Sequence, residues 1–442
     1  MRQTLTCPVD KETQLPVIHR NLQNFSVYCI LNSNSTEQSK ADIYSNYELL
    51  AGIDVVESMP ESKNSFDALQ QFHTRTKDWI FGYFSYDLKN EIENLKSENP
   101  DRINFPSVHF FRPKFVLKIK EGILELDFLA DHTSKEEAQS FLEKLLLPID
   151  NLTCRQEIVH AVNHIDKDKY IKTINKIQEH IQRGDIYEMN FCNEFFAENV
   201  KIDPIAVYNR INELSPMPFS AFYRLNHHYA ICASPERFLA KRGDKIISQP
   251  IKGTARRGKN EEEDKKIIEN LFLDPKERSE NVMIVDLVRN DLSRTAQKGS
   301  VQVEELFGIS SFRRLHQMIS TITSLKRKEV PFTEVIRAAF PMGSMTGAPK
   351  VRAMQLIEEF EESKRGLYSG SIGYIDPNGD FDFNVVIRSI LYNEKKSRIS
   401  YTVGSAITAN ADPEKEYYEC LLKAESMQEA LNASTGKSEE NN

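Results

Sequence analysis

The chain has 442 residues, and its 57 Lys and Arg residues stand against 65 Asp and Glu residues, which gives a formal net charge of −8 at pH 7. This excess of negative charge argues against sequence-independent binding to the phosphates of nucleic acids. Hydrophobic residues at 40% and charged residues at 28% are typical of a soluble globular protein. No segment approaches the roughly 20 consecutive apolar residues that span a bilayer. We therefore expect neither nucleic acid nor a membrane as a partner.

Residues 1–16 contain no apolar stretch long enough for the core of a secretory signal, so we expect a cytoplasmic protein. The cysteines form no C-x-x-C pair and no Cys/His spacing typical of zinc sites. We expect reduced thiols that serve as small core residues, at Cys7, Cys29, Cys154, Cys192, Cys232 and Cys420.

Residues 1–155 are predicted to form an irregular α/β region. Short apolar runs bounded by polar stretches indicate strands, and a Gly122 turn between two alternating runs indicates a hairpin. The predicted elements are strands at 24–31 and 79–86, a hairpin at 114–130 and a helix at 135–147. A link near Pro148 then leads to the next region.

Residues 160–430 are predicted to be more regular and to form one catalytic region. Apolar residues at helical spacing predict a helix at 168–184 that ends at Gly184. Short strands joined by polar or glycine turns predict two antiparallel meanders, at 221–251 and 366–408. The last residues, 432–442, are predicted to be a disordered tail.

Two further helices are predicted to begin after Asp274-Pro275 and Asp412-Pro413, because Asp suits the N-cap and Pro the first helical position. Both helices carry glutamates three residues apart, so each presents a pair of carboxylates on one face. The pairs are Glu277 with Glu280 and Glu416 with Glu419, and Lys423 follows four residues after the second pair. If the two faces meet, they suit Mg²⁺; the alternative is two solvated acidic faces.

The segment SQPIKGTARRG places Lys252 at the end of a predicted strand, next to Gly253 and Thr254. A lysine held there is a candidate nucleophile if its surroundings keep a neutral amine, and otherwise it is a surface lysine in a basic turn. The glycine-rich segment 340–354 lacks the P-loop pattern, but its backbone amides before a helix starting at Pro349 are suited to an anion. A plain helix-entry loop is equally compatible with this segment.

Several motifs follow one another in a characteristic order, namely SPERFL, QPIKGTARRG, SENVMIVDLVRNDLSR, GSMTGAPKVRAM, GLYSGSIGY and EKEYYECLLK. In the residues of these motifs and in their order, residues 165–430 resemble the chorismate-utilising enzymes. This family includes anthranilate synthase component I, aminodeoxychorismate synthase component I, isochorismate synthase and salicylate synthase. The resemblance implies an α+β fold like that of anthranilate synthase component I, with a large antiparallel β-sandwich core and surrounding helices.

The lysine in P-I-K-G-T resembles the aminodeoxychorismate synthase branch of this family, whereas an alanine is usual in anthranilate synthases. This resemblance implies amination of chorismate at C4 to 4-amino-4-deoxychorismate, through a covalent intermediate on Lys252 and with Mg²⁺ as cofactor. It also implies ammonia from a separate glutamine amidotransferase subunit, a downstream aminodeoxychorismate lyase, and a place in folate (para-aminobenzoate) biosynthesis.

The resemblance also implies roles for individual residues of this chain. Lys252 is the expected nucleophile. Glu236 is expected to take part in proton transfer at the leaving hydroxyl group, and His316 is a further catalytic candidate. The expected metal ligands are Glu280 and Glu419, flanked by Glu277 and Glu416. The expected substrate-binding residues are Arg388, Lys423, Tyr374, Thr346, Gly253, Thr254, Gly404, Ser405 and Ala406.

The chain departs from the family pattern at several places. Gln317 holds the position of the usual histidine, with His316 one residue earlier, and Asn193 stands where a glutamine is common. Serine and alanine replace two of the usual glycines after Gly404. The Leu-Leu-Glu-Ser segment of tryptophan-inhibited members corresponds to Leu49-Leu50-Ala51-Gly52 here, so we expect no regulation by tryptophan.

Two alternatives remain open on these observations. The first is anthranilate synthase component I, which releases an aromatic product directly. The second is a catalytically silent subunit that binds and regulates an amidotransferase.

Overall fold

The computed structural model describes residues 1–34, 43–148 and 158–432, and the expected tail at 432–442 lies almost wholly outside them. Every strand pairing among these residues is antiparallel, and the strands follow one another as a continuous folded strip. The first half of the strip is β14 (Gln302–Ser311), β15 (Leu315–Leu325), β12 (Lys245–Gln249), β11 (Arg237–Arg242), β18 (Phe381–Asn384), β17 (Ser371–Ile375), β4 (Ile80–Phe84) and β5 (Val108–Lys120).

The second half begins on the other side of β5. It is β3 (Leu49–Ser58), β2 (Val27–Asn32), β9 (Phe219–Leu225), β10 (His228–Ser234), β19 (Ser389–Asn393), β20 (Arg398–Ile407) and β8 (Glu188–Glu198). Short strands extend the strip at its sides, namely β1 (Arg2–Pro8), β6 (Ile123–Leu129), β7 (Val162–Asn163), β13 (Ile251–Arg256) and β16 (Gly347–Ala348).

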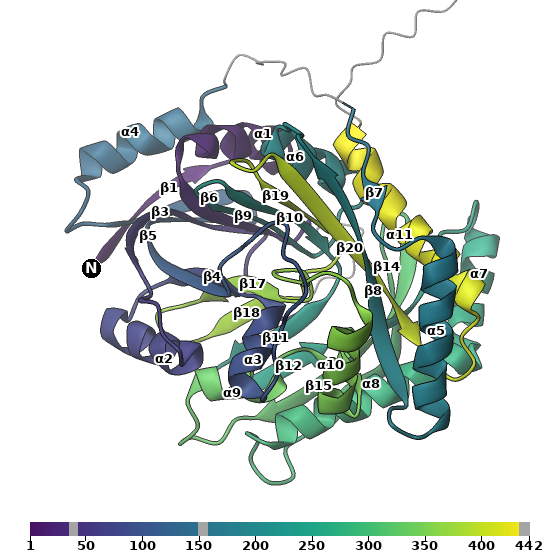
Figure 1. Ribbon diagram of the computed structural model, residues 1–442. Helices are drawn as coiled ribbons and strands as arrows, with labels where there is room; N and C mark the ends of the chain where they lie inside the picture. Colours follow the sequence, from purple (N-terminus) through teal and green to yellow (C-terminus); the bar gives the residue numbers. More distant parts are fainter. Residues whose placement is uncertain (35–42, 149–157, 433–442) are drawn as a thin grey trace, which may run out of the picture.

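Helices lie around this antiparallel core (Figure 1). They are α1 (Lys11–Asn21), α2 (Ser65–Thr76), α3 (Lys89–Ile92), α4 (Lys135–Leu146), α5 (Lys167–Gln182), α6 (Pro204–Leu214), α7 (Glu261–Leu273), α8 (Pro275–Ser293), α9 (Phe332–Ala339), α10 (Lys350–Phe360) and α11 (Pro413–Asn432). Short 3₁₀ turns occur at η1 (Leu22–Asn24), η2 (Tyr86–Leu88) and η3 (Gly343–Met345). The expected α+β class with a large antiparallel core is confirmed.

Local chemistry explains the elements that the sequence predicts well. The β5–β6 hairpin turns through two residues with positive φ, 50° at Glu121 and 73° at Gly122, as a tight hairpin requires. Asp274 caps α8 by accepting hydrogen bonds from the Lys276 and Glu277 amides, and Asp412 accepts from the Glu414 amide at the start of α11. Both predicted helix starts are therefore confirmed.

The two predicted meanders are wrong in one respect, because each is interrupted in its middle. The β9–β10 hairpin belongs to one half of the strip and β11–β12 to the other, and β17–β18 and β19–β20 divide in the same way. The chain crosses between the halves at residues 235–236 and again at 385–388. Hydrogen bonds join the two crossings, with the Val385 amide donating to the Glu236 carbonyl at 3.0 Å and the Ala233 amide to the Arg388 carbonyl at 3.2 Å.

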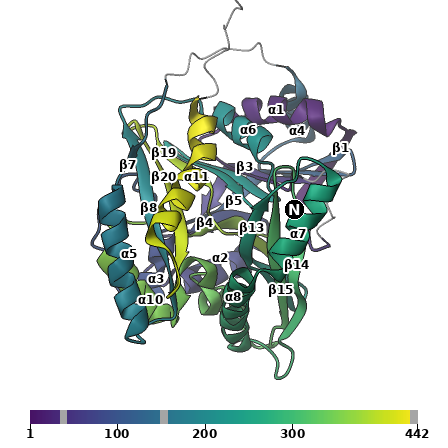
Figure 2. The same ribbon diagram turned by 90° about the vertical axis from the view of Figure 1, so that its right-hand side faces the viewer.

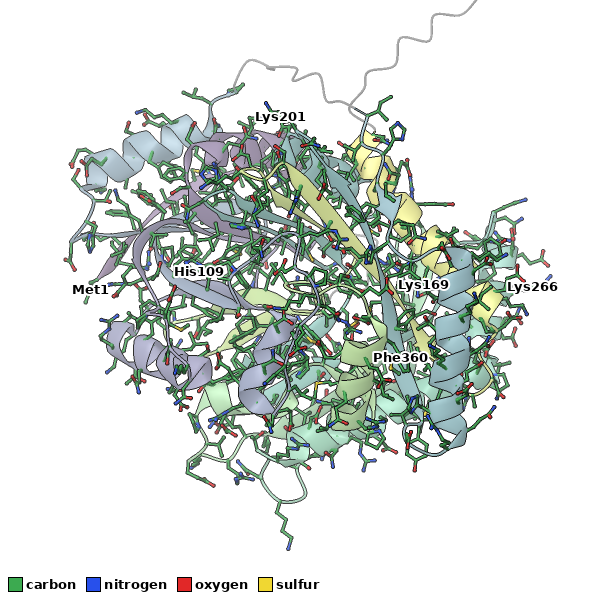
Figure 3. All side chains as sticks on the ribbon, in the orientation of Figure 1. Met1, His109, Lys169, Lys201, Lys266 and Phe360 are labelled. Carbon is green, nitrogen blue, oxygen red and sulfur yellow. The ribbon has the colours of Figure 1, made fainter. Side chains whose placement is uncertain are left out.

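Side chains fill the space between the sheets, while Lys169 and Lys266 lie on the outer faces of α5 and α7 (Figure 3). Two large hydrophobic clusters form most of the interior, and each combines early and late parts of the chain, such as Leu117 with Ile390 and Phe81 with Phe383. Within the described ranges, no helix is both long enough and apolar enough to cross a membrane. The cysteines in those ranges are unpaired thiols, most of them buried, and Cys154 lies outside them.

Candidate active site

Lys252 is the second residue of β13, and its side chain is largely buried, with 10% of its surface exposed. Strand β12 ends before Pro250, so the lysine begins a new short strand rather than closing the preceding one. Its Nζ donates a hydrogen bond to Oε1 of Glu188, at the start of β8, over 2.6 Å. Burial by itself lowers the pKa of Lys252, but the carboxylates of Glu188, Glu280 and Glu236 raise it above its usual value. The resting lysine is therefore an ammonium.

Gly253 follows Lys252 with a φ of +91°, which fits the predicted backbone turn at this glycine. A Cβ there would lie 3.2 Å from the Glu277 carboxylate, so the backbone of β13 passes close beside α8. Thr254 is exposed, and it pairs with Gln317 of β15. The structure thus places Gly253, but not the side chain of Thr254, against the carboxylate-bearing helix.

Helices α8 and α11 bring the predicted carboxylate pairs to the same place. Helix α8 packs on β13 and β15, and α11 packs on β20 (Figure 2). Lys276 links the two helices, because its Nζ lies 3.9 Å from Glu280 Oε1 and 3.6 Å from Glu416 Oε1. The charge of Lys252 also reaches Glu277 and Glu419. Residues far apart in the sequence therefore form one acidic cluster around two lysines.

The carboxylates of the cluster differ in charge. Burial raises the pKa of Glu280 to about 7, and it also raises the pKa of Glu277. Glu419 is half-exposed; burial works to raise its pKa, but Lys423 holds it below the ordinary value. Glu416 is buried and accepts a hydrogen bond from the Ser405 hydroxyl. Near pH 7 the cluster holds both carboxylates that are readily ionised and carboxyls that are costly to ionise.

The donor set fits a hard divalent cation such as Mg²⁺. Oε1 of Glu280 is buried without a hydrogen-bond partner among the described residues, and the Lys276 ammonium at 3.9 Å is too far away to donate one. Such an oxygen can accept a metal ion or a water molecule. No three His, Cys, Asp or Glu side chains in those residues lie close enough together to hold an ion alone. Mg²⁺ commonly takes only one or two carboxylates and completes its shell with water and an anionic substrate.

Glu236 lies at the first crossing between the two halves of the core, and its side chain is buried. The Ser344 hydroxyl, in the glycine-rich segment, donates a hydrogen bond to Glu236 Oε1 at 2.6 Å. Burial raises the pKa of Glu236 to about 7, with Ser344 and the charge of Lys252 acting in the opposite direction. A carboxyl group with such a pKa can give or take a proton near neutral pH.

Polar groups on β20 and α11 border the acidic cluster. Lys423 Nζ binds Glu419 Oε1 at 2.8 Å and donates to the Gly404 carbonyl at 2.9 Å. Residues 404–406 pair with β8, whereas β19 pairs with β20 only as far as Tyr401. The backbone of Gly404, Ser405 and Ala406 therefore lacks β19 as a neighbour on its second side.

Thr346 is a buried polar candidate and Arg388 a partly buried cationic one, and the two have different surroundings. The Thr346 hydroxyl donates to the Met342 carbonyl at 3.1 Å, so it braces its own loop. Arg388 lies at the second crossing, where its guanidinium contacts Met217 Sδ at 4.0 Å and has no carboxylate partner in the described ranges. Burial lowers the pKa of Arg388. A partly buried guanidinium without a carboxylate partner among the described residues is suited to an anionic ligand.

Two predicted site residues lie outside this cluster. Both ring nitrogens of His316 are engaged elsewhere, Nε2 with Asp264 of α7 at 2.9 Å and Nδ1 with Ser311 at 2.8 Å. Tyr374 packs against Trp79 and lines a different cavity. The structure thus gives His316 a bracing position between β14, β15 and α7 and brings neither residue to Lys252.

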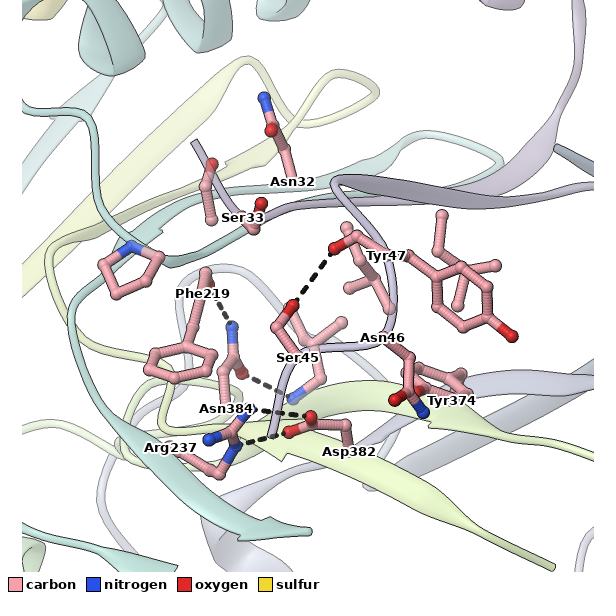
Figure 4. A pocket seen from close by; sticks show the side chains of 15 residues that line it. Asn32, Ser33, Ser45, Asn46, Tyr47, Phe219, Arg237, Tyr374, Asp382 and Asn384 are labelled. Atoms are coloured by element: carbon pink, nitrogen blue, oxygen red, sulfur yellow. Dashed lines mark hydrogen bonds and ion pairs between the residues drawn. The ribbon is translucent and has the colours of Figure 1, made fainter. Parts of the chain in front are cut away.

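The cavity that Tyr374 lines has a volume of about 70 Å³ (Figure 4). Arg237 and Asp382 form an ion pair at 3.0 Å within its lining, and Asn384 donates to the Phe219 carbonyl. Leu50, from the segment that corresponds to the tryptophan-site motif, also lines it. None of the residues of the acidic cluster belongs to the described lining, so the cavity is distinct from the candidate active site.

Sequence reasoning missed Glu188 and Lys276. Glu188 begins a buried strand, β8, that the sequence analysis does not predict, and Lys276, next to Glu277, is not among the predicted site residues. The available signal for Glu188 is a carboxylate at the start of a segment that mixes apolar residues with Asn and Glu, after the helix stop at Gly184. A buried carboxylate of this kind requires a cationic partner.

Comparisons with known proteins find similar chains. A family model described as chorismate binding enzyme matches residues 26–429. The chain is 36% identical over 394 residues to the chloroplastic aminodeoxychorismate synthase of Arabidopsis thaliana, covering 84% of this chain and 42% of that protein. It is 33% identical over 363 residues to aminodeoxychorismate synthase component 1 of Bacillus subtilis, covering 80% of this chain and 77% of that protein.

Among solved structures, anthranilate synthase component I from Streptococcus pneumoniae is similar with a TM-score of 0.77 at 25% identity. The match covers 89% of this chain and 95% of that one.

Proposed function

Because the chain belongs to the chorismate-binding enzyme family, we propose that it aminates chorismate at ring carbon C4 and forms 4-amino-4-deoxychorismate. The observation that carries this proposal is the buried Lys252, held by Glu188 beside the acidic cluster of α8 and α11. The relatives named aminodeoxychorismate synthase support the same choice within the family.

Substrate binding has to overcome like-charge repulsion, since chorismate carries two carboxylates and the site is rich in glutamates. Glu280 and Glu419 are the residues that would bind Mg²⁺, with Glu277 and Glu416 as flanking carboxylates, and the buried Glu280 Oε1, which lacks a hydrogen-bond partner among the described residues, is the first candidate ligand atom. When bound, the ion supplies positive charge to which a substrate carboxylate is attracted. Arg388 and Lys423 supply cationic groups from this chain for the anionic substrate.

Lys252 and Glu236 carry the chemistry of the proposal. The neutral amine of Lys252 forms a bond to ring carbon C2 while the C4 hydroxyl leaves as water, with its proton taken from the Glu236 carboxyl. Ammonia then bonds to C4 and the lysine leaves from C2. The pKa of Glu236, raised to about 7, suits a group that gives up a proton near neutral pH.

Other proteins complete the proposed reaction sequence. A separate glutamine amidotransferase subunit would supply ammonia, and a downstream lyase would remove pyruvate to form para-aminobenzoate for folate. The chain spans only 42% of the Arabidopsis relative, so these partner functions belong to the proposal and not to the residues described here.

The proposal is tested by incubating the isolated chain with chorismate, Mg²⁺ and an ammonium salt, and by analysing the products by mass spectrometry and fluorescence. We expect a non-aromatic amino product that keeps the enolpyruvyl group and becomes para-aminobenzoate only after a lyase is added. Fluorescent anthranilate would instead identify the anthranilate synthase alternative, which the structural neighbour keeps open. Absence of turnover would favour a silent regulatory subunit.

A further inference from the structure

The contact between Glu188 and Lys252 has a property that the proposed function does not use. Glu188 is 2% exposed, and its Oε1 accepts the hydrogen bond from Lys252 Nζ at 2.6 Å. Its other oxygen, Oε2, is buried without a hydrogen-bond partner among the described residues. The carboxylate therefore lies in direct contact with the reacting nitrogen and retains acceptor capacity.

A buried ammonium cannot attack a carbon atom, because its nitrogen has no free electron pair until a proton leaves. The carboxylates that influence Lys252 are Glu188, Glu236 and Glu280. Glu236 is hydrogen-bonded to Ser344, and Glu280 faces Lys276 on α8. Glu188 is the member of this group with a hydrogen bond to Nζ in the structure.

We propose that Glu188 is the base that activates Lys252, an inference that rests on the proposed function. The Lys252 ammonium passes one proton to the Glu188 carboxylate, and the neutral amine forms the bond to C2 as the C4 hydroxyl leaves. When ammonia bonds to C4 and the C2–N bond breaks, Lys252 departs as a neutral amine and recovers its proton from the Glu188 carboxyl. The proton thus stays between these two residues for the lifetime of the adduct.

The backbone around Glu188 is held firmly enough for this task. Glu188 pairs with Ala348 of β16, and a Cβ on Gly347 would lie 2.2 Å from the Glu188 carbonyl oxygen. Only a glycine allows such a close approach. The glycine-rich segment therefore fixes the position of the base through Gly347, while it supplies Ser344 to Glu236.

A counter-ion without a catalytic role would leave the same contact in the resting structure, but it predicts a different outcome. Removing a mere counter-ion favours the neutral amine, because a carboxylate stabilises the ammonium. Lys252 would then react as fast as before or faster. Removing a base leaves the amine without a proton acceptor and slows its attack, by about 100-fold or more on the scale typical of general bases.

The experiment compares the parent chain with Glu188→Gln and with Glu194→Gln as a matched control. Glu194 is also a buried glutamate of β8, on the same face of the strand, but it pairs with Arg102 and Ser400. Each protein is mixed with chorismate and Mg²⁺ without ammonium, and the mass gain on the Lys252 peptide, chorismate less one water, is followed in time. Turnover with ammonium then gives kcat and KM.

We expect Glu188→Gln to slow adduct formation and kcat at least 100-fold with KM for chorismate within threefold, and Glu194→Gln to behave like the parent. Glu188→Asp, which keeps the carboxylate but withdraws it, should recover part of the rate, and it carries the test if Glu188→Gln does not fold. Adduct formation at the parent rate or faster in Glu188→Gln would overturn the inference alone. A parent that turns over chorismate without any Lys252 adduct would overturn both the inference and the Lys252 step of the proposed function. A parent that does not turn over chorismate would overturn the proposed function itself.

Discussion

At the scale of single residues, the site combines groups whose charges are set by opposing influences. Burial alone disfavours the charged forms of Lys252, Glu236 and Glu280 alike, but neighbouring carboxylates keep the lysine protonated while burial raises the pKa of both glutamates to about 7. The result is a site with protons on groups that can exchange them near neutral pH.

The raised pKa of Glu236 makes stability depend on pH. The folded chain binds this proton more tightly than the unfolded chain does, whose ordinary glutamate pKa is near 4.5. The stabilisation is complete below pH 4.5 and is lost as pH rises through about 7, by at most about 3 kcal/mol. We expect Glu236→Gln to reduce the fall in unfolding free energy between pH 5 and pH 8, measured by urea denaturation. An unchanged difference between these pH values would contradict the burial of an ionisable Glu236.

Replacing Glu280 separates metal binding from folding. Glu280→Ala removes the orphaned oxygen that we expect to bind Mg²⁺, so Mg²⁺-dependent turnover should fall at least 100-fold. The fold should tolerate the change, because a carboxyl group whose pKa is raised by burial does not favour the folded state at pH 8. Calorimetric titration with Mg²⁺ and thermal unfolding of the same variant check both parts. Full activity would reject Glu280 as a ligand.

At the scale of secondary structure elements, the site depends on where strands are interrupted. Glu236 and Arg388 occupy the two crossings between the halves of the core, and hydrogen bonds join those crossings. Lys252 follows the break at Pro250 between β12 and β13. Residues at such breaks are free of the alternation that fixes side chains inside a regular strand, so they can point into the site.

The contact between β16 and β8 is expected to be sensitive to one methyl group. In Gly347→Ala the new Cβ would meet the Glu188 carbonyl oxygen, so the strands must separate, and we expect a loss of about 3 kcal/mol in unfolding free energy with impaired activity. Gly243→Ala is the control, since Gly243 also has a positive φ of 60° but open space around it, and should cost about 1 kcal/mol. Equal losses in the two variants would show that backbone strain alone decides the effect.

Local signals in the sequence sufficed for helix starts, the β5–β6 hairpin and the carboxylate faces, because capping, turn and spacing rules act over a few residues. They did not reveal the divided meanders, because a crossing depends on which distant strand each segment pairs with. For the same reason the partner of Lys252, Glu188, was missed, and Tyr374 was assigned to a site that its strand does not face. The motif resemblance indicates the family, whereas the neighbours of each site residue become clear only in the structure.

At the scale of the whole molecule, the early and late parts of the chain form one folding unit. Strand β2 pairs with both β3 and β9, and β4 pairs with β5 and β17, so the sheet passes twice between residues before 150 and after it. Both hydrophobic clusters are shared in the same way. Separating the two regions would expose unpaired strand edges and split both cores.

We therefore expect that residues 1–155 and 160–430, produced as separate proteins, do not fold by themselves, whereas the whole chain unfolds in a single transition. Circular dichroism, amide exchange and urea denaturation of the three proteins test this. A cooperatively folded 160–430 fragment would show that the first region is dispensable for the core. Mixing the two fragments provides the control, because complementary edges should restore some structure.

The register between β13 and β15 shifts between Ile251 and Thr254, which leaves Lys252 outside the regular ladder. The side chain at position 252 can therefore be changed without altering the register of any strand. Paired exchanges of Lys252 and its buried partner Glu188 should keep the strand pairing while the products diverge, which makes the scaffold a starting point for redirecting the fate of one metabolite.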